Sequence, residues 1–569
     1  MKTNKFAFLI STILITSLLL PLPAVSVDAA DKKSRFFDVT LMTPIGNVAR
    51  EKAGQIIARD LEKIGIGVNL RYMEFATLAN HWKSGGANGT LFDDGGFDML
   101  ILQTSMFATI DPVGFYRAFA SDQFPKSGKN YTRYINPEFD KYAYKALVTV
   151  DDQERWNLVQ EAEKLIYNDL PTIPLWHPAY FHGVRSDVKF PEYKDPEDWW
   201  AYSFRWAKRE IKGKTKKDMT LRERTLIYAQ PSDLDAFIPG YRASGYSLFA
   251  TGYTVFDSLI HQTDAPYFRG PKEQRGPQPA LAENWDVSID GKIWTMNLRK
   301  KATWHDGTPF TADDVIFTYD LIVNKDALYE SEAFIKEVGI TWKKIDKYTV
   351  EFTSEKYNPL FSSEFLTRHI LPKHLFSKVP PQDLMKSDYN TGKKVVGNGP
   401  WVFDEYKPAE YLKLKANDNY YGGRPEFDYL IVKFIPQAAS AWYALKTGDI
   451  DVTNHMYGFS RELDDANSDP NIYAVIDPLT AIQNIQINAE HPILSNIWVR
   501  RAISLASNRD VMVKVISNGL GVAAQQHLPP WSPGFAPDLE PMAYDLNEAK
   551  KMMVKAGYNY DDVTIKGPK

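Results

Sequence analysis

Few residues of this 569-residue chain are spaced for bond-making chemistry. His177 and His182 stand five positions apart in an expected strand, so their side chains point to opposite faces and do not share a metal ion. The carboxylate pairs Asp93-Asp94 and Asp313-Asp314 fit an exposed loop and a helix N-terminus. The sequence alone supports no pairing of a nucleophile with a base. It therefore predicts a binding protein that is not an enzyme, with no cofactor and no metal site.

The composition excludes further kinds of site and partner. The absence of cysteine excludes disulfides, thiolate metal sites and the lipid-attached cysteine of a lipoprotein. Lysine and arginine number 67 against 71 aspartates and glutamates, which gives a formal net charge of −4, and no long basic run is present. Nucleic acid is therefore not an expected partner. The length predicts several domains with a large core.

The first 30 residues have the features of an export signal. Lys2 and Lys5 precede an apolar stretch over 6–20, and Ala29-Ala30 forms a small-residue cleavage site. We expect a signal peptide over 1–30 and an extracytoplasmic location. The alternative is an uncleaved membrane anchor, because the apolar region approaches the roughly 20 residues that span a bilayer.

Strand-like and helical stretches alternate from residue 38 onward. Strands are expected at 38–42, 68–73, 97–102, 171–181 and 225–229, helices at 47–64, 151–168, 496–518 and 547–556, and hairpins at 285–299 and 401–414. This alternation predicts an α/β architecture with much parallel pairing. Residues 208–217 are mostly charged and predict a solvated linker.

One long stretch carries a specific pattern. It contains 279–285, then 290–295, and then 304–315, which begins Trp-His-Asp-Gly-Thr-Pro-Phe; further motifs stand at 397–401 and 444–451. The pattern resembles the family 5 extracellular solute-binding proteins. These are the oligopeptide, dipeptide and nickel receptors of ABC importers.

The order of the segments differs from that family. Residues 38–207 are similar to its C-terminal part, and residues 220–569 resemble its N-terminal part. The resemblance therefore implies a circular permutant, joined across the charged segment 208–218. A short string at 38–44 is repeated at 562–568, as a trimmed duplication would leave. The rival explanation is a tandem receptor, or a misassembled gene, that lost its outer halves.

The resemblance implies a two-lobed periplasmic-binding-protein-like α/β fold of class II, with an enlarged lobe I and a permuted order. Lobe II would comprise 31–177 and 481–569. Lobe I would comprise 219–480 with 178–207 as a return segment, and 208–218 would be the linker. Strands crossing between the lobes are expected near 176–178 and 477–480, with the ligand in the cleft between the lobes.

The same resemblance implies a set of ligand-binding residues. They are Phe75, Trp82, Phe107, Ala108, Asp111, Trp176, Gln230, Tyr253, Asn398 and Trp401. Ala108 stands where peptide-binding members place an aspartate that pairs with the ligand's α-amino group. A desolvated ammonium without a carboxylate is costly, so uncharged solutes such as oligosaccharides are favoured over peptides. For Asp111 a turn residue is the favoured interpretation, and each aromatic residue has ordinary core packing as its alternative.

The function implied is that of a monomeric extracytoplasmic receptor. It would capture a peptide, an oligosaccharide or a similar small solute and deliver it to the permease subunits of an ABC importer, without bond chemistry. A surface sensory or adhesion module without a transporter is the alternative, and an extracellular hydrolase on the same scaffold is the third possibility.

Overall fold

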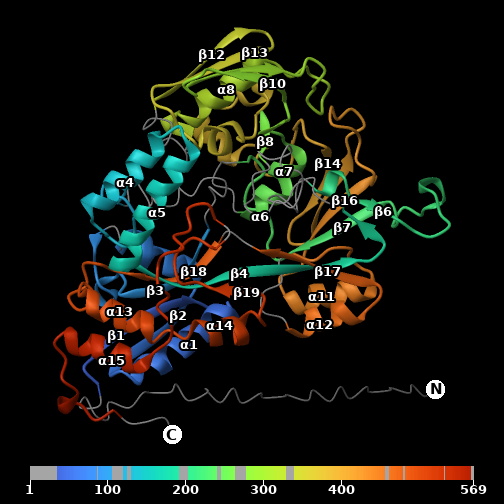
Figure 1. Ribbon diagram of the computed structural model, residues 1–569. Coiled ribbons are helices and arrows are strands. Elements are labelled where there is room, and N and C mark those ends of the chain that lie inside the picture. The colour runs from blue at the N-terminus through green and yellow to red at the C-terminus, as the bar shows by residue number, and fades with distance from the viewer. Residues whose placement is uncertain are drawn as a thin grey trace, which may run out of the picture.

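Most of the expected strands and helices are present in the computed structural model of the chain (Figure 1). The structure describes residues 35–45, 47–85, 88–105, 119–124, 130–190, 203–239, 245–262, 277–327, 339–454, 460–478, 481–530 and 532–565. The signal expected over 1–30 and the site residues Phe107, Ala108 and Asp111 lie outside these ranges. Within them, no helix is both long and apolar enough to cross a membrane.

The first body of the molecule is built on a mixed sheet. In spatial order its strands are β17 (Ile472–Pro478), β4 (Thr172–Arg185), β18 (Ala481–Ile487), β3 (Met99–Ser105), β1 (Phe37–Pro44) and β2 (Ile66–Met73), and β19 (Gly521–Ala523) pairs with β4. β1 is parallel to β2 and β3, whereas β18 is antiparallel to β3 and β4. Strands from both ends of the sequence thus share one sheet.

Four helices share the core of this sheet. They are α1 (Val48–Glu62), α13 (Ile497–Leu505), α14 (Arg509–Ile516) and α15 (Leu546–Lys555). Leu41 and Ile485 from the strands meet Ile57, Ile503 and Met553 from the helices, and all five are fully buried. Apolar residues at strand and helix spacing therefore produce this body from sequence-distant segments.

Polar caps decide where these helices begin. Asn47 accepts a hydrogen bond from the backbone N–H of Arg50, and Asn496 accepts one from Trp498. The single helical run expected over 496–518 is wrong, because Asn508 caps a second start and divides the run into α13 and α14.

β4 joins the first body to a second body. It is 14 residues long and extends beyond the end expected for it at residue 181. Its first part pairs with β18 and its second part with β17, and these two partners are consecutive in the chain. Two antiparallel segments, 172–185 and 472–487, therefore run together between the bodies (Figure 1). Residues 479–480 of the second segment lie outside the described ranges.

The second body contains a four-stranded sheet. Its strands are β14 (Trp401–Lys407), β15 (Tyr411–Ala416), β16 (Tyr429–Phe434) and β7 (Thr225–Gln230), in that order. β14 and β15 confirm the hairpin expected over 401–414. β7 is parallel to β16 and lies next to β4, because Val452 bridges both Tyr228 and Val184.

A third sheet carries the stretch that gave the family resemblance. It contains β10 (Ala282–Val287), β11 (Ile293–Leu298), β13 (Thr349–Ser354) and β12 (Ile340–Asp346), and α8 (Ala312–Ile322) packs against it. The hairpin expected over 285–299 is confirmed. One hydrophobic cluster joins this sheet to α4 (Pro137–Val148) and α5 (Asp152–Asp169), which lie beside it in Figure 1.

Short elements complete the described fold. The strands are β5 (Val188–Lys189), β6 (Lys208–Arg209), β8 (Ile260–Gln262) and β9 (Pro277–Pro279). The helices are α2 (Phe75–Ala79), η2 (Asn80–Gly85), η4 (Phe92–Asp94), η5 (Ser203–Arg205), η6 (Lys216–Asp218), α6 (Gly245–Ser247), η7 (Leu248–Gly252), α7 (Tyr253–Val255), η9 (Lys325–Ala327), η10 (Phe361–Leu366), α10 (Lys373–Phe376), η11 (Pro381–Lys386), α11 (Ala438–Thr447), α12 (Ser460–Ser468) and η12 (Tyr560–Asp562).

The two ends of the described chain lie against each other. The ring of Phe36 is 5.0 Å from the rings of both Tyr558 and Tyr560, and Phe37 is 5.1 Å from Tyr558. The hydroxyl of Tyr560 donates to the carbonyl of Ile64 at 2.9 Å. The last helix of the chain therefore leads directly to the edge where β1 begins.

Candidate functional site

A band of polar side chains lies where β3 and β18 meet α1. Gln483 donates to Oε1 of Gln103 at 2.7 Å and accepts from Nε of Arg50 at 3.1 Å. Asn484 is buried and donates to Oγ1 of Thr104 at 2.8 Å. These contacts gather at the carboxyl end of β3, beside the crossing strands. This is the edge of an α/β sheet at which ligands are commonly bound.

The two histidines of β4 have separate backbone partners. Nδ1 of His177 lies 3.2 Å from the carbonyl of Ala481, and Nδ1 of His182 lies 3.3 Å from the carbonyl of Thr453. Burial lowers the pKa of His177 to about 4, so this imidazole is neutral near pH 7. In the described part of the chain, no group of three or more histidine, aspartate or glutamate side chains is placed to hold a metal ion.

A hollow of about 120 Å³ lies beside α7. It is lined by Pro239, Leu248, Tyr253, Ile322, Thr367, Arg368 and His369. The rings of Tyr253 and His369 meet edge to face, with centroids 5.1 Å apart. In Figure 1, α6 and α7 lie above β4, on the side of the third sheet.

Arg368 supplies the charge of this hollow. Burial lowers the pKa of His369 to about 4, so that ring is neutral near pH 7. Its Nε2 has no hydrogen-bond partner among the described residues. The guanidinium of Arg368 forms no ion pair with any described carboxylate. A partly buried, uncompensated cation beside a neutral donor or acceptor suits an anionic group of a ligand.

Backbone contacts fix the segment that carries these two residues. His369 forms a bridge with Ser258, and the N–H of Ile370 donates to the carbonyl of Asp257 at 2.9 Å. The carboxylate of Asp257 in turn accepts from the hydroxyl of Tyr420 at 2.7 Å. The wall of the hollow is therefore part of a hydrogen-bonded, buried framework.

The residues from the third sheet to near the end of the described chain identify the family. Residues 276–566, just over half of the chain, match the family described as bacterial extracellular solute-binding proteins, family 5 Middle. The chain belongs to this family.

Two of the curated relatives carry peptide-related names, and another, 25% identical over 352 residues with 59% and 62% covered, is the heme-binding protein A of Haemophilus influenzae. The oligopeptide-binding protein AppA of Bacillus subtilis (strain 168) is 30% identical over 316 residues, which cover 54% of this chain and 58% of AppA. The dipeptide-binding protein of Escherichia coli (strain K12) is 26% identical over 358 residues, with 59% and 64% covered. The solved structure of B. subtilis AppA with a nonapeptide has 25% identity and a TM-score of 0.48, with 58% and 64% covered. The chain thus spans less than two thirds of the length of each.

Two of the tryptophans that the family resemblance implied as ligand contacts are buried. Trp176 is 2% exposed and packs in the core of the first body with Ile173 and Leu175. Trp401 is 0% exposed and packs in the core of the second body with Leu226. Packing accounts for both rings, although the indole N–H of Trp401 has no hydrogen-bond partner among the described residues, and contact of either side chain with a ligand stays a prediction.

The structure does not bring Gln230 and Trp401 together. Gln230 ends β7, whereas the strand registers place Trp401 level with the residues just before Thr225, at the other end of the sheet. The separation along the strands is about 20 Å, with two further strands between β7 and β14. Asn398, three residues before Trp401, is 2% exposed, and neither amide atom has a partner among the described residues.

Of the three remaining predicted contacts in the described ranges, Phe75 and Trp82 follow β2 of the first body and Tyr253 belongs to α7. Trp82 lies in η2, half buried, with its ring 4.5 Å from that of Tyr131. Phe75 begins α2. Tyr253, predicted as a ligand contact, lines the hollow beside α7. Arg368 and His369 line the same hollow and were not among the predicted contacts. The signal available in the sequence was the pair Arg368-His369, which stands between the apolar pairs Phe365-Leu366 and Ile370-Leu371.

Proposed function

We propose that this chain is the extracytoplasmic solute-binding receptor of an ABC importer. The observation that carries the proposal is the family match over 276–566. The two bodies joined by paired strands support it, because such an arrangement lets a cleft close on a solute. The receptor is exported by the signal over 1–30, acts as a monomer, and delivers its solute to permease subunits without changing it chemically.

The solute is a peptide or a similar small molecule that carries a carboxylate. Names of relatives support the peptide class, since AppA is called an oligopeptide-binding protein. Arg368 supports the carboxylate, because its charge has no described carboxylate to neutralise it. The alanine at position 108 disfavours anchoring of an α-amino group. The two features together favour recognition through an acidic group, which modifies the expectation of an uncharged solute.

We also propose that the segments stand in a circularly permuted order. Lobe II would combine 31–177 with 481–569, and lobe I would comprise 219–480 with the return segment 178–207. The contact of Phe36 with Tyr558 supports this order, because the family's usual chain would continue directly from one to the other. A variant that starts at residue 219, runs to 565 and continues into 35–207 should fold to the same circular dichroism spectrum. If the rearranged variant does not fold under conditions in which the present chain folds, the permutation is contradicted.

A thermal-shift screen tests the receptor function. The full chain is mixed with di- to nonapeptides, oligosaccharides, small dicarboxylates and Ni²⁺ complexes. A ligand at 100 times its dissociation constant stabilises the folded state by about 2.7 kcal/mol, so the bound class raises the melting temperature. The expected result is a rise with carboxylate-bearing peptides or acids. A melting temperature that no class moves would contradict the receptor function.

A further inference from the structure

The segment between Arg209 and Arg222, here called the junction loop (210–221), stands away from the body of the protein. Residues 212–218 are all exposed, and Figure 1 shows the segment projecting beyond β6. A hollow of about 550 Å³ separates it from Glu426 and Phe427. The linker expected over 208–218 is therefore solvated along most of its length.

Most of the bonds that shape the junction loop are internal to it and its flank. The N–H of Thr215 donates to Asp218 at 2.9 Å, and Lys214 pairs with Glu223 at 2.7 Å. Lys216 reaches outward, to the carbonyl of Glu426 and to the carboxylate of Asp428 at 3.4 Å. Surface hydrogen bonds of this kind open locally at low free energy, as proteolysis requires.

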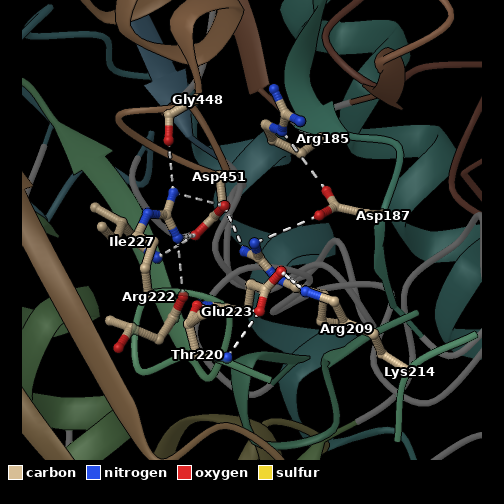
Figure 2. Close-up of polar contacts among 11 residues, drawn as sticks. Arg185, Asp187, Arg209, Lys214, Thr220, Arg222, Glu223, Ile227, Gly448 and Asp451 are labelled. Atoms are coloured by element: carbon tan, nitrogen blue, oxygen red, sulfur yellow. Dashed lines mark hydrogen bonds and ion pairs between the residues drawn. The ribbon is translucent and has the colours of Figure 1, made fainter. Parts of the chain in front are cut away.

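Both ends of the loop meet at one buried carboxylate, which Figure 2 shows in close-up. Asp451 is fully buried and accepts from Nη2 of Arg209 at 2.5 Å and from Nη1 of Arg222 at 2.9 Å. Arg222 also donates to the carbonyl of Gly448 at 2.7 Å. The two arginines that flank the loop are thus held by the same group.

The carboxylate is itself held by the second body. The N–H of Ile227 in β7 donates to Oδ2 of Asp451 at 2.8 Å. The N–H of Arg185, the last residue of β4, donates to the backbone carbonyl of Asp451 at 2.9 Å. Separating a buried carboxylate from its cations is costly, so this arrangement, here called the clasp, fixes both ends of the loop.

We propose that the junction loop is a proteolytic processing site, and that the clasp keeps the divided chain as one folded protein. Lys212, Lys214, Lys216 and Lys217 are all exposed and offer four bonds to a lysine-directed protease. In the cut, the oxygen of water bonds to the lysine carbonyl carbon and the C–N bond breaks. Both protons of the water end on the leaving nitrogen, so the new ends are a carboxylate and an ammonium.

The two products remain interlocked through their sheets. The first product carries β4 and β3, and the second carries β17, β18 and β19, which pair with them. Cutting the loop therefore breaks no strand pairing. The proposal does not depend on which solute the protein binds.

The cleavage itself is tested on the full chain under native conditions. A lysine-specific endoprotease is expected to cut within 212–217, and the two products are expected to co-elute in size-exclusion chromatography. A matched variant with K212Q, K214Q, K216Q and K217Q should lose only that cut. Absence of cutting there before global unfolding, or separation of the products in native buffer, would overturn the proposal.

The clasp is tested by comparing intact and divided chains. Asp451→Asn is expected to lower the melting temperature of the divided chain more than that of the intact chain, because the uncut loop keeps the ends near each other. Arg222→Gln gives the same comparison if Asp451→Asn does not fold. Asp313→Asn, a half-exposed carboxylate paired with Lys344, should lower both chains equally. Equal losses for all variants would overturn the role of the clasp.

Discussion

The two ends of β4 have different polar surroundings. Near its start, the neutral ring of His177 and the amides of Gln483 and Asn484 form a band beside the crossing strands, and the guanidinium of Arg50 donates to one of these amides. Beyond its end, at Arg185, a buried carboxylate is neutralised by Arg209 and Arg222. One strand therefore connects a region held mainly by hydrogen bonds of amides, near the expected cleft, to a region held by ion pairs.

The difference reflects what each region has to do. Neutral amides can exchange partners when a ligand arrives, and Asn484 keeps an oxygen without a described partner. A buried carboxylate favours the arrangement in which its arginines hold it, because separating it from them leaves it unpaired, even though Arg209 also lies 3.4 Å from Asp187. We therefore expect substitutions in the charged region beyond Arg185 to change the free energy of unfolding. Substitutions around the hollow that Tyr253 and Arg368 line should instead change the affinity for the solute.

The largest effect is expected from Asp451→Asn. The substitution leaves Arg209 and Arg222 without their shared carboxylate and should lower the free energy of unfolding by about 3–5 kcal/mol. Urea unfolding followed by tryptophan fluorescence measures it. A loss below about 1 kcal/mol would show that the charges are solvated rather than clasped.

The neutral end of β4 should be sensitive to pH. Burial lowers the pKa of His177 from 6.5 to about 4, so the unfolded chain takes up the proton first as the pH falls. The stabilisation is complete above pH 6.5 and decreases by about 1.4 kcal/mol per pH unit toward pH 4. Urea titrations of His177→Gln between pH 7 and 4 should show a flatter dependence. An unchanged slope would contradict the buried neutral imidazole.

Arg368→Gln should separate affinity from stability. If the guanidinium binds the solute's carboxylate, the variant should bind the best carboxylate-bearing solute about 10- to 100-fold more weakly in calorimetry. Its unfolding should change little, since no described carboxylate depends on it. Lys343→Gln, which removes a largely exposed cation, is the matched control and should keep full affinity. Equal affinity for both variants would remove Arg368 from the site.

The smallest effect is expected at an exposed ion pair. Lys145 and Glu154 are 3.0 Å apart and both 55% exposed. Glu154→Gln should change the free energy of unfolding by no more than about 0.5 kcal/mol, because water screens the pair. Urea unfolding of Glu154→Gln and Asp451→Asn under the same conditions measures the difference between their losses of unfolding free energy. A loss comparable to that of Asp451→Asn would show that burial does not distinguish the two ion pairs.

Much of the secondary structure could be predicted because it depends on local patterns. The strand at 38–42 and the helix at 47–64 follow from apolar spacing and from the Asn47 cap, and both are present. The break at Asn508 was missed because apolar residues continue at helical spacing on both sides of it.

The linear pattern of residues is enough to identify the family, because the residue types and spacing of the motifs over the third sheet are specific. It also determined the solvated character of 212–218, since a run of charges cannot form a core. Long-range packing, in contrast, buries Trp176 and Trp401 and holds Gln230 far from Trp401. It also placed Arg209 and Arg222 on Asp451. These outcomes depend on pairing between segments hundreds of residues apart, which local spacing does not encode.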